Sequence, residues 1–163
     1  MLPIAASATL WLCSAAILAG MVADLLTYRI PNLVSLLVVA LFPVLLLLAG
    51  GDRNWLAHVG IMAGFFAAGL LLFRFGWFGG GDVKFLAAVG LWIDPPRLAI
   101  FLMHTTLIGG ALALLLLGLR RLPADWLGRR LPARLRGLRI LAPGAPVPYG
   151  VAIGLGALTT GLG

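Results

Sequence analysis

The sequence has very little charge. Only 10% of its 163 residues are charged, glutamate is absent, and all five acidic residues are aspartates. Hydrophobic residues make up 62% of the chain, and its mean hydropathy is +1.10. A water-soluble domain of this size needs more polar residues to cover its surface. The composition therefore excludes a soluble domain and predicts an integral membrane protein.

Cysteine is also scarce, because Cys13 is the only one in the chain. This excludes an internal disulfide and a zinc site built from cysteines. His58 and His104 stand alone in apolar runs, without the carboxylates or cysteines that complete a metal site. We therefore expect neither a metal nor a cofactor, and we interpret the two histidines as packing or interfacial residues.

The first apolar run has no basic residue before it, so it lacks the charged start of a secretory signal. We expect it to remain as a helix. A spanning helix needs about 20 apolar residues. The sequence therefore predicts an all-α membrane protein in which residues 1–163 form a single domain of about six transmembrane helices. The long runs are Leu2–Ala23, Leu33–Gly51, Trp55–Phe73 and Leu98–Leu119, and the last helix is expected from about Val147.

The fourth predicted helix is too short for an ordinary span. The residues between Asp82 and Asp94 would cover roughly 17 Å as a helix, about half of a 30 Å hydrocarbon core. Gly79–Gly81 come directly before Asp82. Irregular backbone at membrane depth is tolerated only where protein buries it or where it lines a wet cavity. The spacing therefore indicates an aqueous pocket beside Asp82.

Basic residues predict the orientation of the chain. Ten of the twelve follow the first, third and fifth predicted spans, whereas Arg53 and Arg97 lie on the opposite side. The positive-inside rule then places both termini outside the cytoplasm. Seven arginines fall in residues 120–139, and we expect this segment to contact anionic lipid rather than nucleic acid. The tryptophans are expected to anchor the spans at the membrane interface: Trp11, Trp55, Trp77, Trp92 and Trp126.

Two aspartates stand out because both are predicted on the cytoplasmic side. Asp24 ends the first apolar run, and Asp82 follows the glycine-rich turn. A carboxylate in a membrane costs a few kcal/mol on insertion scales and calls for a functional explanation. Two carboxylates that share a proton can activate water and polarise a carbonyl group. Taken singly, Asp24 is also explained as a border residue and Asp82 as a helix cap.

Three short motifs resemble those of one protein family. The run Gly79-Gly80-Gly81-Asp82-Val83-Lys84 resembles the G-x-G-D-x-K signature of the type IV prepilin peptidases, which are intramembrane aspartyl enzymes. Asp24 with the downstream Ile30-Pro31-Asn32 is similar to their first aspartate and its I-P-N. Pro148-Tyr149-Gly150 resembles the P-[YF]-G near the start of their last helix. The resemblance covers nearly the whole chain.

This resemblance implies a function and a set of site residues. Asp24 and Asp82 would be catalytic, and Gly79 and Gly81 would let the backbone present Asp82. The substrate would be a prepilin or pseudopilin precursor, cut after the glycine that ends its basic leader and before its hydrophobic helix, at the cytoplasmic face of the bacterial inner membrane. Larger members also carry paired cysteines and methylate the product. This chain lacks those cysteines and resembles the short, peptidase-only form associated with tight-adherence (Flp) pili.

Several roles stay open at this point. Lys84 either tunes the carboxylate pair or extends its ammonium group to the interface. The Pro148-Tyr149-Gly150 run either borders the substrate cleft or shapes the entry to the last helix, and Pro31 and Asn32 are further candidates for the cleft. The sequence leaves the oligomeric state open. Rival functions are a non-catalytic membrane component of a pilus or secretion assembly and a small proton-coupled transporter.

Overall fold

The computed structural model describes residues 3–49, 54–122, 142 and 144–162. These residues form helices and no strand, which confirms the predicted all-α class. Four helices in the described ranges are long and apolar enough to span a membrane. They are α1 (Ile4–Thr27), α2 (Asn32–Ala49), α3 (Trp55–Arg74) and α5 (Leu98–Arg120). A 3-10 turn, η1 (Pro95–Arg97), precedes α5. The two shorter helices are α4 (Gly80–Gly90) and α8 (Tyr149–Thr160).

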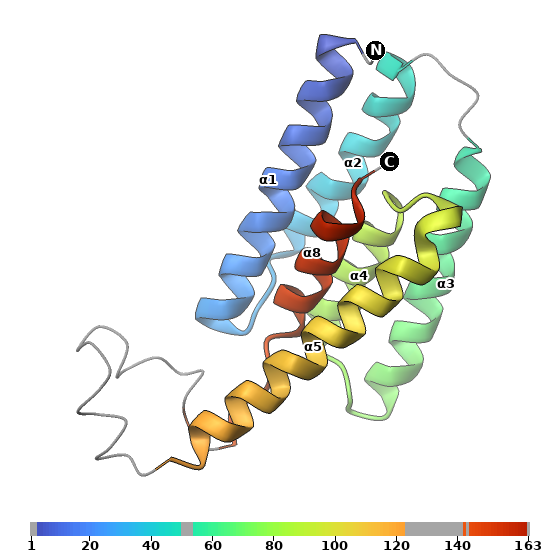
Figure 1. Ribbon diagram of the computed structural model, residues 1–163. Helices are drawn as coiled ribbons and strands as arrows, with labels where there is room; N and C mark the ends of the chain where they lie inside the picture. Colours follow the sequence, from blue (N-terminus) through green and yellow to red (C-terminus); the bar gives the residue numbers. More distant parts are fainter. Residues whose placement is uncertain (1–2, 50–53, 123–141, 143, 163) are drawn as a thin grey trace.

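The two short helices lie among the long ones (Figure 1). α4 packs against α2, α3 and α8, and α8 packs in turn against α1 and α5. Most of α4 is buried, including Val83, Phe85 and Val89, although it is too short to cross a hydrocarbon core. The interior of the bundle is therefore built around helices that could not span a membrane alone.

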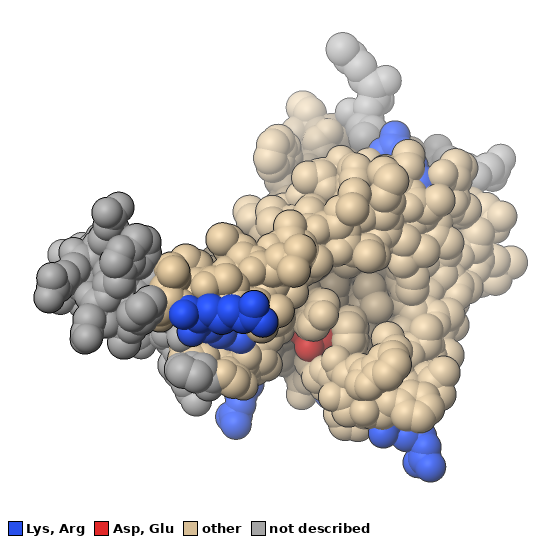
Figure 2. Space-filling view, turned by 60° about the horizontal axis from the view of Figure 1, so that its bottom comes forward, with Lys and Arg blue, Asp and Glu red and all other residues tan. Residues whose placement is uncertain are grey.

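One end of the bundle carries the turns that lie beside Asp24 and Asp82. The α1–α2 turn, the α3–α4 turn and the start of α8 lie together at the lower end in Figure 1, while the N-terminus lies at the other. Figure 2 looks toward this lower end, where an acidic side chain lies in a hollow and several Lys and Arg side chains lie elsewhere on the same face. Asp24 and Asp82 therefore lie at the same end of the molecule. Residues 123–141, with Trp126 and most of the arginine-rich segment, lie outside the described residues.

The outer surface of the long helices is apolar. Trp11, Leu47 and Leu114 are 77%, 84% and 72% exposed. A helix that is hydrophobic all round is stable either in a protein core or in a bilayer. Because these side chains are not covered by protein, the exterior of the bundle is a surface suited to lipid.

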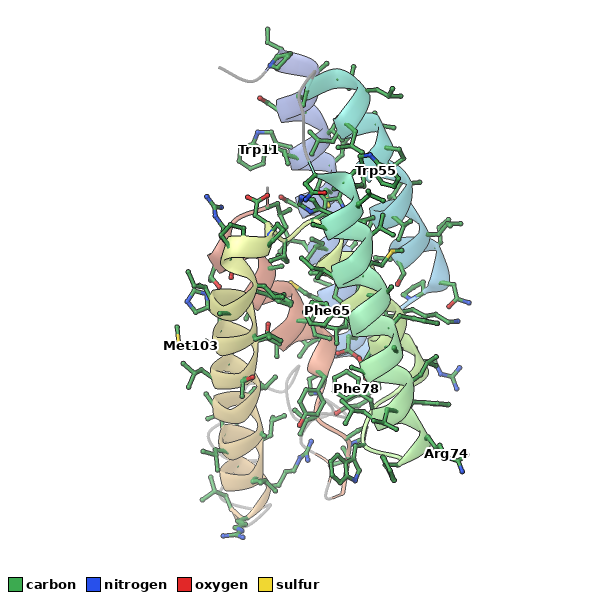
Figure 3. The ribbon with its side chains drawn as sticks, turned by 90° about the vertical axis from the view of Figure 1, so that its right-hand side faces the viewer. Trp11, Trp55, Phe65, Arg74, Phe78 and Met103 are labelled. Atoms are coloured by element: carbon green, nitrogen blue, oxygen red, sulfur yellow. The ribbon has the colours of Figure 1, made fainter. Side chains whose placement is uncertain are left out.

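Close contact between α3 and α4 depends on small residues. A Cβ atom added at Gly69 of α3 would lie 2.8 Å from Val83 Cγ1 of α4. A Cβ added at Gly90 of α4 would come just as close to the ring of Phe65 in α3. On its other side Phe65 points toward α5, where it stacks with Phe101 at a centroid distance of 5.7 Å (Figure 3). Small residues at such contacts let membrane helices gain packing energy.

The far end of α4 is fixed by polar contacts inside the bundle. Trp92 is fully buried, and its indole N–H donates to the Val38 carbonyl at 2.9 Å. The expectation that Trp92 anchors the chain at the interface is therefore wrong, because α2 supplies the partner that the indole N–H needs. His58 is also buried, with Nδ1 3.0 Å from the Leu91 carbonyl and Nε2 3.8 Å from Asp94 Oδ1.

The α3–α4 contact can be tested with two alanine substitutions in α3. Gly60 has no atom within 4 Å of an added Cβ, so Gly60→Ala gains helix propensity without a clash. Gly69→Ala gains the same propensity but drives a methyl group into Val83. We expect Gly69→Ala to be less stable than Gly60→Ala by about 1–3 kcal/mol, the usual cost of overpacking. Thermal unfolding in detergent measures the difference, and equal melting temperatures would contradict this packing.

Candidate active site

Asp24 lies in the last turn of α1 and is 4% exposed. The helix ends at Tyr28, which adopts a left-handed conformation (φ 54°, ψ 28°) and donates its N–H to the Asp24 carbonyl at 2.8 Å. Helices commonly end at a residue in this left-handed conformation, although that residue is normally glycine or asparagine. The chain then reverses through Pro31 into α2, so Asp24 faces the interior just before the turn.

The first turn of α8 holds the carboxylate of Asp24. Gly150 N–H donates to Asp24 Oδ2 at 2.8 Å. A Cβ at Gly150 would lie 2.8 Å from the same oxygen and 2.7 Å from Ile30 Cδ1, so only glycine allows this approach. The start of a helix also favours negative charge, through its free N–H groups and its dipole. Gly150 therefore positions Asp24, and the buried Pro148 and the exposed Tyr149 lead the chain into α8.

Asp82 lies in the first turn of α4. Its Oδ2 accepts a hydrogen bond from the Gly79 N–H at 3.2 Å, and Gly79 has the extended conformation of a helix N-cap. A Cβ at Gly81 would lie 3.5 Å from the backbone nitrogen of Ile30, so this turn packs closely on the chain that leaves α1. Asp82 thus has the geometry of a helix cap while its carboxylate borders a pocket.

That pocket brings the separate motifs together. It has a volume of about 340 Å³ and is lined by Asp24, Asp82, Asn32, residues 28–30 and residues 79–81. The two carboxylates come from α1 and α4 and are near enough for the charge of one to act on the other. The arrangement provides two acidic groups at one polar, partly enclosed site.

Asp82 lies outside the four helices that are long enough to span. Burial, followed by the charge of Asp24, raises the pKa of Asp82 from 3.8 to about 6, although the hydrogen bond from Gly79 opposes this shift. Like charges in one buried site cannot both ionise easily, so such a pair retains one proton over a wide pH range. A protonated and an ionised carboxylate can then act as acid and base.

The other predicted site residues lie around this pocket or beyond it. Lys84 Nζ donates to Asn32 Oδ1 at 3.0 Å, and no ion pair joins Lys84 to either aspartate in the part of the chain that the structure describes. Asn32 lines the pocket, whereas Pro31 forms the exposed turn before α2. Tyr149 stacks on Phe78 at a centroid distance of 5.4 Å.

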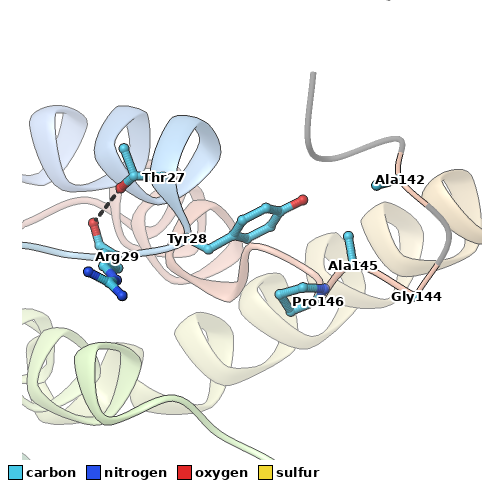
Figure 4. A pocket seen from close by; sticks show the side chains of 7 residues that line it. All are labelled: Thr27, Tyr28, Arg29, Ala142, Gly144, Ala145 and Pro146. Carbon is cyan, nitrogen blue, oxygen red and sulfur yellow. Dashed lines mark hydrogen bonds between the residues drawn. The ribbon is translucent and has the colours of Figure 1, made fainter. Parts of the chain in front are cut away.

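Four residues that line the pocket were not among the predicted site residues: Tyr28, Arg29, Ile30 and Gly80. Ile30 is buried between Gly81 and Gly150, and only its place in the I-P-N motif could have indicated this. Tyr28 and Arg29 border both this pocket and a neighbouring one of about 660 Å³, whose other side is formed by residues 144–146 (Figure 4). No sequence pattern indicated that Tyr28 would take a left-handed conformation.

A comparison with family models identifies the chain. The type IV leader peptidase family matches residues 10–114, a range that contains Asp24, Asp82 and the glycines before it. The chain belongs to this family. The match indicates a membrane peptidase, and it ends before the Pro148-Tyr149-Gly150 run. Neither a curated protein nor a solved structure matches the chain.

The contact between Gly150 and Asp24 predicts a large effect of one added methyl group on peptidase activity. Gly150→Ala should push the Asp24 carboxylate away and disturb its hydrogen bond to the α8 backbone. We expect a roughly ten- to hundredfold loss of activity, as for a lost hydrogen bond to a charged group. Gly110→Ala is the control, because nothing lies within 4 Å of its added Cβ. Similar activities of the two variants in a cleavage assay would argue against this role of Gly150.

Proposed function

We propose that the chain is an intramembrane aspartic endopeptidase that removes the leader of type IV or Flp-type prepilins. Cleavage follows the glycine at the end of the leader, on the cytoplasmic side of the bacterial inner membrane. The observation that supports this best is that Asp24 and Asp82, from two separate helices, line one pocket in a chain of a peptidase family. Asp24 and Asp82 form the catalytic pair of this proposal.

Both carboxylates accept a hydrogen bond from a backbone N–H at the start of a helix, but the one to Asp24 is 2.8 Å long and the one to Asp82 is 3.2 Å, which suggests different roles. Asp24 faces the N–H groups at the start of α8, a setting that stabilises a negative charge. Burial and the charge of Asp24 disfavour the ionised form of Asp82, and in this proposal Asp82 holds the shared proton. Asp24 then takes a proton from water, whose oxygen attacks the scissile carbonyl, while Asp82 donates its proton to the carbonyl oxygen. Collapse of the tetrahedral intermediate breaks the peptide bond, as Asp24 gives its proton to the leaving amine and Asp82 takes one hydroxyl proton back from the intermediate, which restores the starting pair.

Substitution of each aspartate tests the assignment. Asp24→Asn and Asp82→Asn each remove one proton-transfer group and should lower cleavage of a co-expressed Flp-type prepilin by at least about a hundredfold. Asp94→Asn is the matched control, because Asp94 lies at the far end of the bundle beside His58. A gel shift from precursor to mature pilin measures cleavage. Full processing by either of the first two variants would refute the catalytic pair and favour a non-catalytic role.

The raised pKa of Asp82 also predicts a dependence of stability on pH. A carboxyl group with a pKa of about 6 when folded, against 3.8 unfolded, stabilises the fold below pH 4, and this contribution is lost as the pH rises through 6. Asp82→Asn keeps a neutral side chain at every pH. We therefore expect the variant to melt above wild type at pH 8 and close to it at pH 4, measured in the same detergent. An equal difference at both pH values would mean that ionisation of Asp82 is not the cause.

A further inference from the structure

A second pocket of about 760 Å³ lies between α2 and α3, outside the active site. Leu36 and Val39 form its wall on α2, and Met62 and Phe66 form the wall on α3. These side chains belong to the apolar exterior of the bundle, with Leu36 63% exposed. The groove therefore opens toward lipid.

The groove has a closed end and an open end. At the closed end Phe42 of α2 stacks on His58 of α3, with ring centroids 5.2 Å apart. Below this contact both helices pack on α4, whose Ala87 and Ala88 form the floor between them. The other end of the groove is bordered by Asn32 and Lys84, which are joined by a hydrogen bond.

Asn32 connects the groove with the active site, because it lines both pockets. Lys84 lies two residues after Asp82 in the same helix. A chain lying in the groove would therefore pass Asn32 and enter the pocket that Asp24 and Asp82 line. This connection to the active-site pocket is the reason to consider the groove, rather than another part of the lipid-facing surface, as a binding site.

The length of the groove matches two turns of an α-helix. From Asn32 to Val39 it follows α2 for seven residues, which is about 10 Å or two helical turns. Ala63, Ala87 and Ala88 are small, and small residues let the backbone of another membrane helix approach closely. The first turn of any helix has free backbone N–H groups. If a helix lay in the groove with its first turn near the active site, these groups would lie beside the polar Asn32.

We infer that this groove binds the first two turns of the apolar substrate helix that follows the scissile bond. The inference rests on the proposed peptidase function and adds the surface that recognises the membrane part of the substrate. The helix lies against Ala63, Ala87 and Ala88, and its N-terminal end unwinds past Asn32 into the active-site pocket. Peptide bonds near Asp82 are then extended while the rest of the substrate remains helical.

Filling the groove should block the substrate helix without touching the carboxylates. Ala63 and Ala68 are both exposed on α3, but a helix turns 100° per residue, and Ala68 faces away from the groove. The variants are Ala63→Phe and the matched control Ala68→Phe. Each is assayed on a membrane precursor with a basic leader, a glycine and a 20-residue apolar helix. A second probe is a short soluble peptide that ends four residues after the glycine.

We expect Ala63→Phe to cleave the membrane precursor about tenfold more slowly than Ala68→Phe, which corresponds to about 1.4 kcal/mol. The two variants should cleave the soluble peptide equally. If wild type cleaves the precursor and both variants match it, the groove assignment is overturned while the peptidase function stands. Equal losses on both probes also overturn it, because the substitution then acts on the active site. If wild type cleaves neither probe, the proposed function itself fails and the groove assignment falls with it.

A photo-crosslinking side chain at position 63 separates a substrate helix from lipid as the occupant. Used with Asp82→Asn to prevent turnover, it should form an adduct with the membrane precursor, and the same probe at position 68 should not. Adducts with lipid alone, or equal precursor adducts from both positions, overturn the inference.

Discussion

The hydrogen bond from Gly150 to Asp24 is the contact on which the arrangement of the site depends. It joins the first long helix to the last short one, across 126 residues of sequence. Ile30 fills the space between Gly150 and Gly81, so the positions of α1, α4 and α8 are set together. Any side chain at Gly150 would separate these helices and also move Asp24 relative to Asp82.

The short length of α4 makes this site possible. Contacts elsewhere in the bundle offset the stability that is lost by burying a carboxylate at the start of this helix. A helix of 11 residues covers about 17 Å, so its start can meet the α1–α2 turn inside the bundle. Placing a carboxylate there disfavours its ionised form and costs stability. At the other end of α4 the buried Trp92 and the contact of His58 with the Leu91 carbonyl hold the helix in place. Proteins commonly accept such local costs at functional sites and offset them elsewhere.

The long helices could be predicted from the sequence because each is a continuous apolar run. The predicted run Trp55–Phe73 differs from α3 by one residue, and Leu33–Gly51 differs from α2 by one residue at its start and two at its end. The short helices were harder, since α4 already ends at Gly90 and α8 begins only at Tyr149. Both aspartates were identified as candidates, but their meeting in one pocket depends on tertiary packing. The burial of Trp92 and the position of Ile30 also result from tertiary packing, which cannot be predicted from the pattern of one segment alone.

Charge alone cannot guide a basic leader to this site, because Arg29 lines the pocket of the two aspartates and Lys84 is hydrogen-bonded to Asn32 at its edge. A carboxylate pair that shares a proton contributes only about one negative charge. On the proposed function, most of the binding energy must therefore come from the apolar part of the substrate. Energy gained by a remote segment can be used to hold the reacting bond in an otherwise unfavourable geometry. An apolar groove that leads past Asn32 to Asp82 supplies that energy next to the bond that is cut.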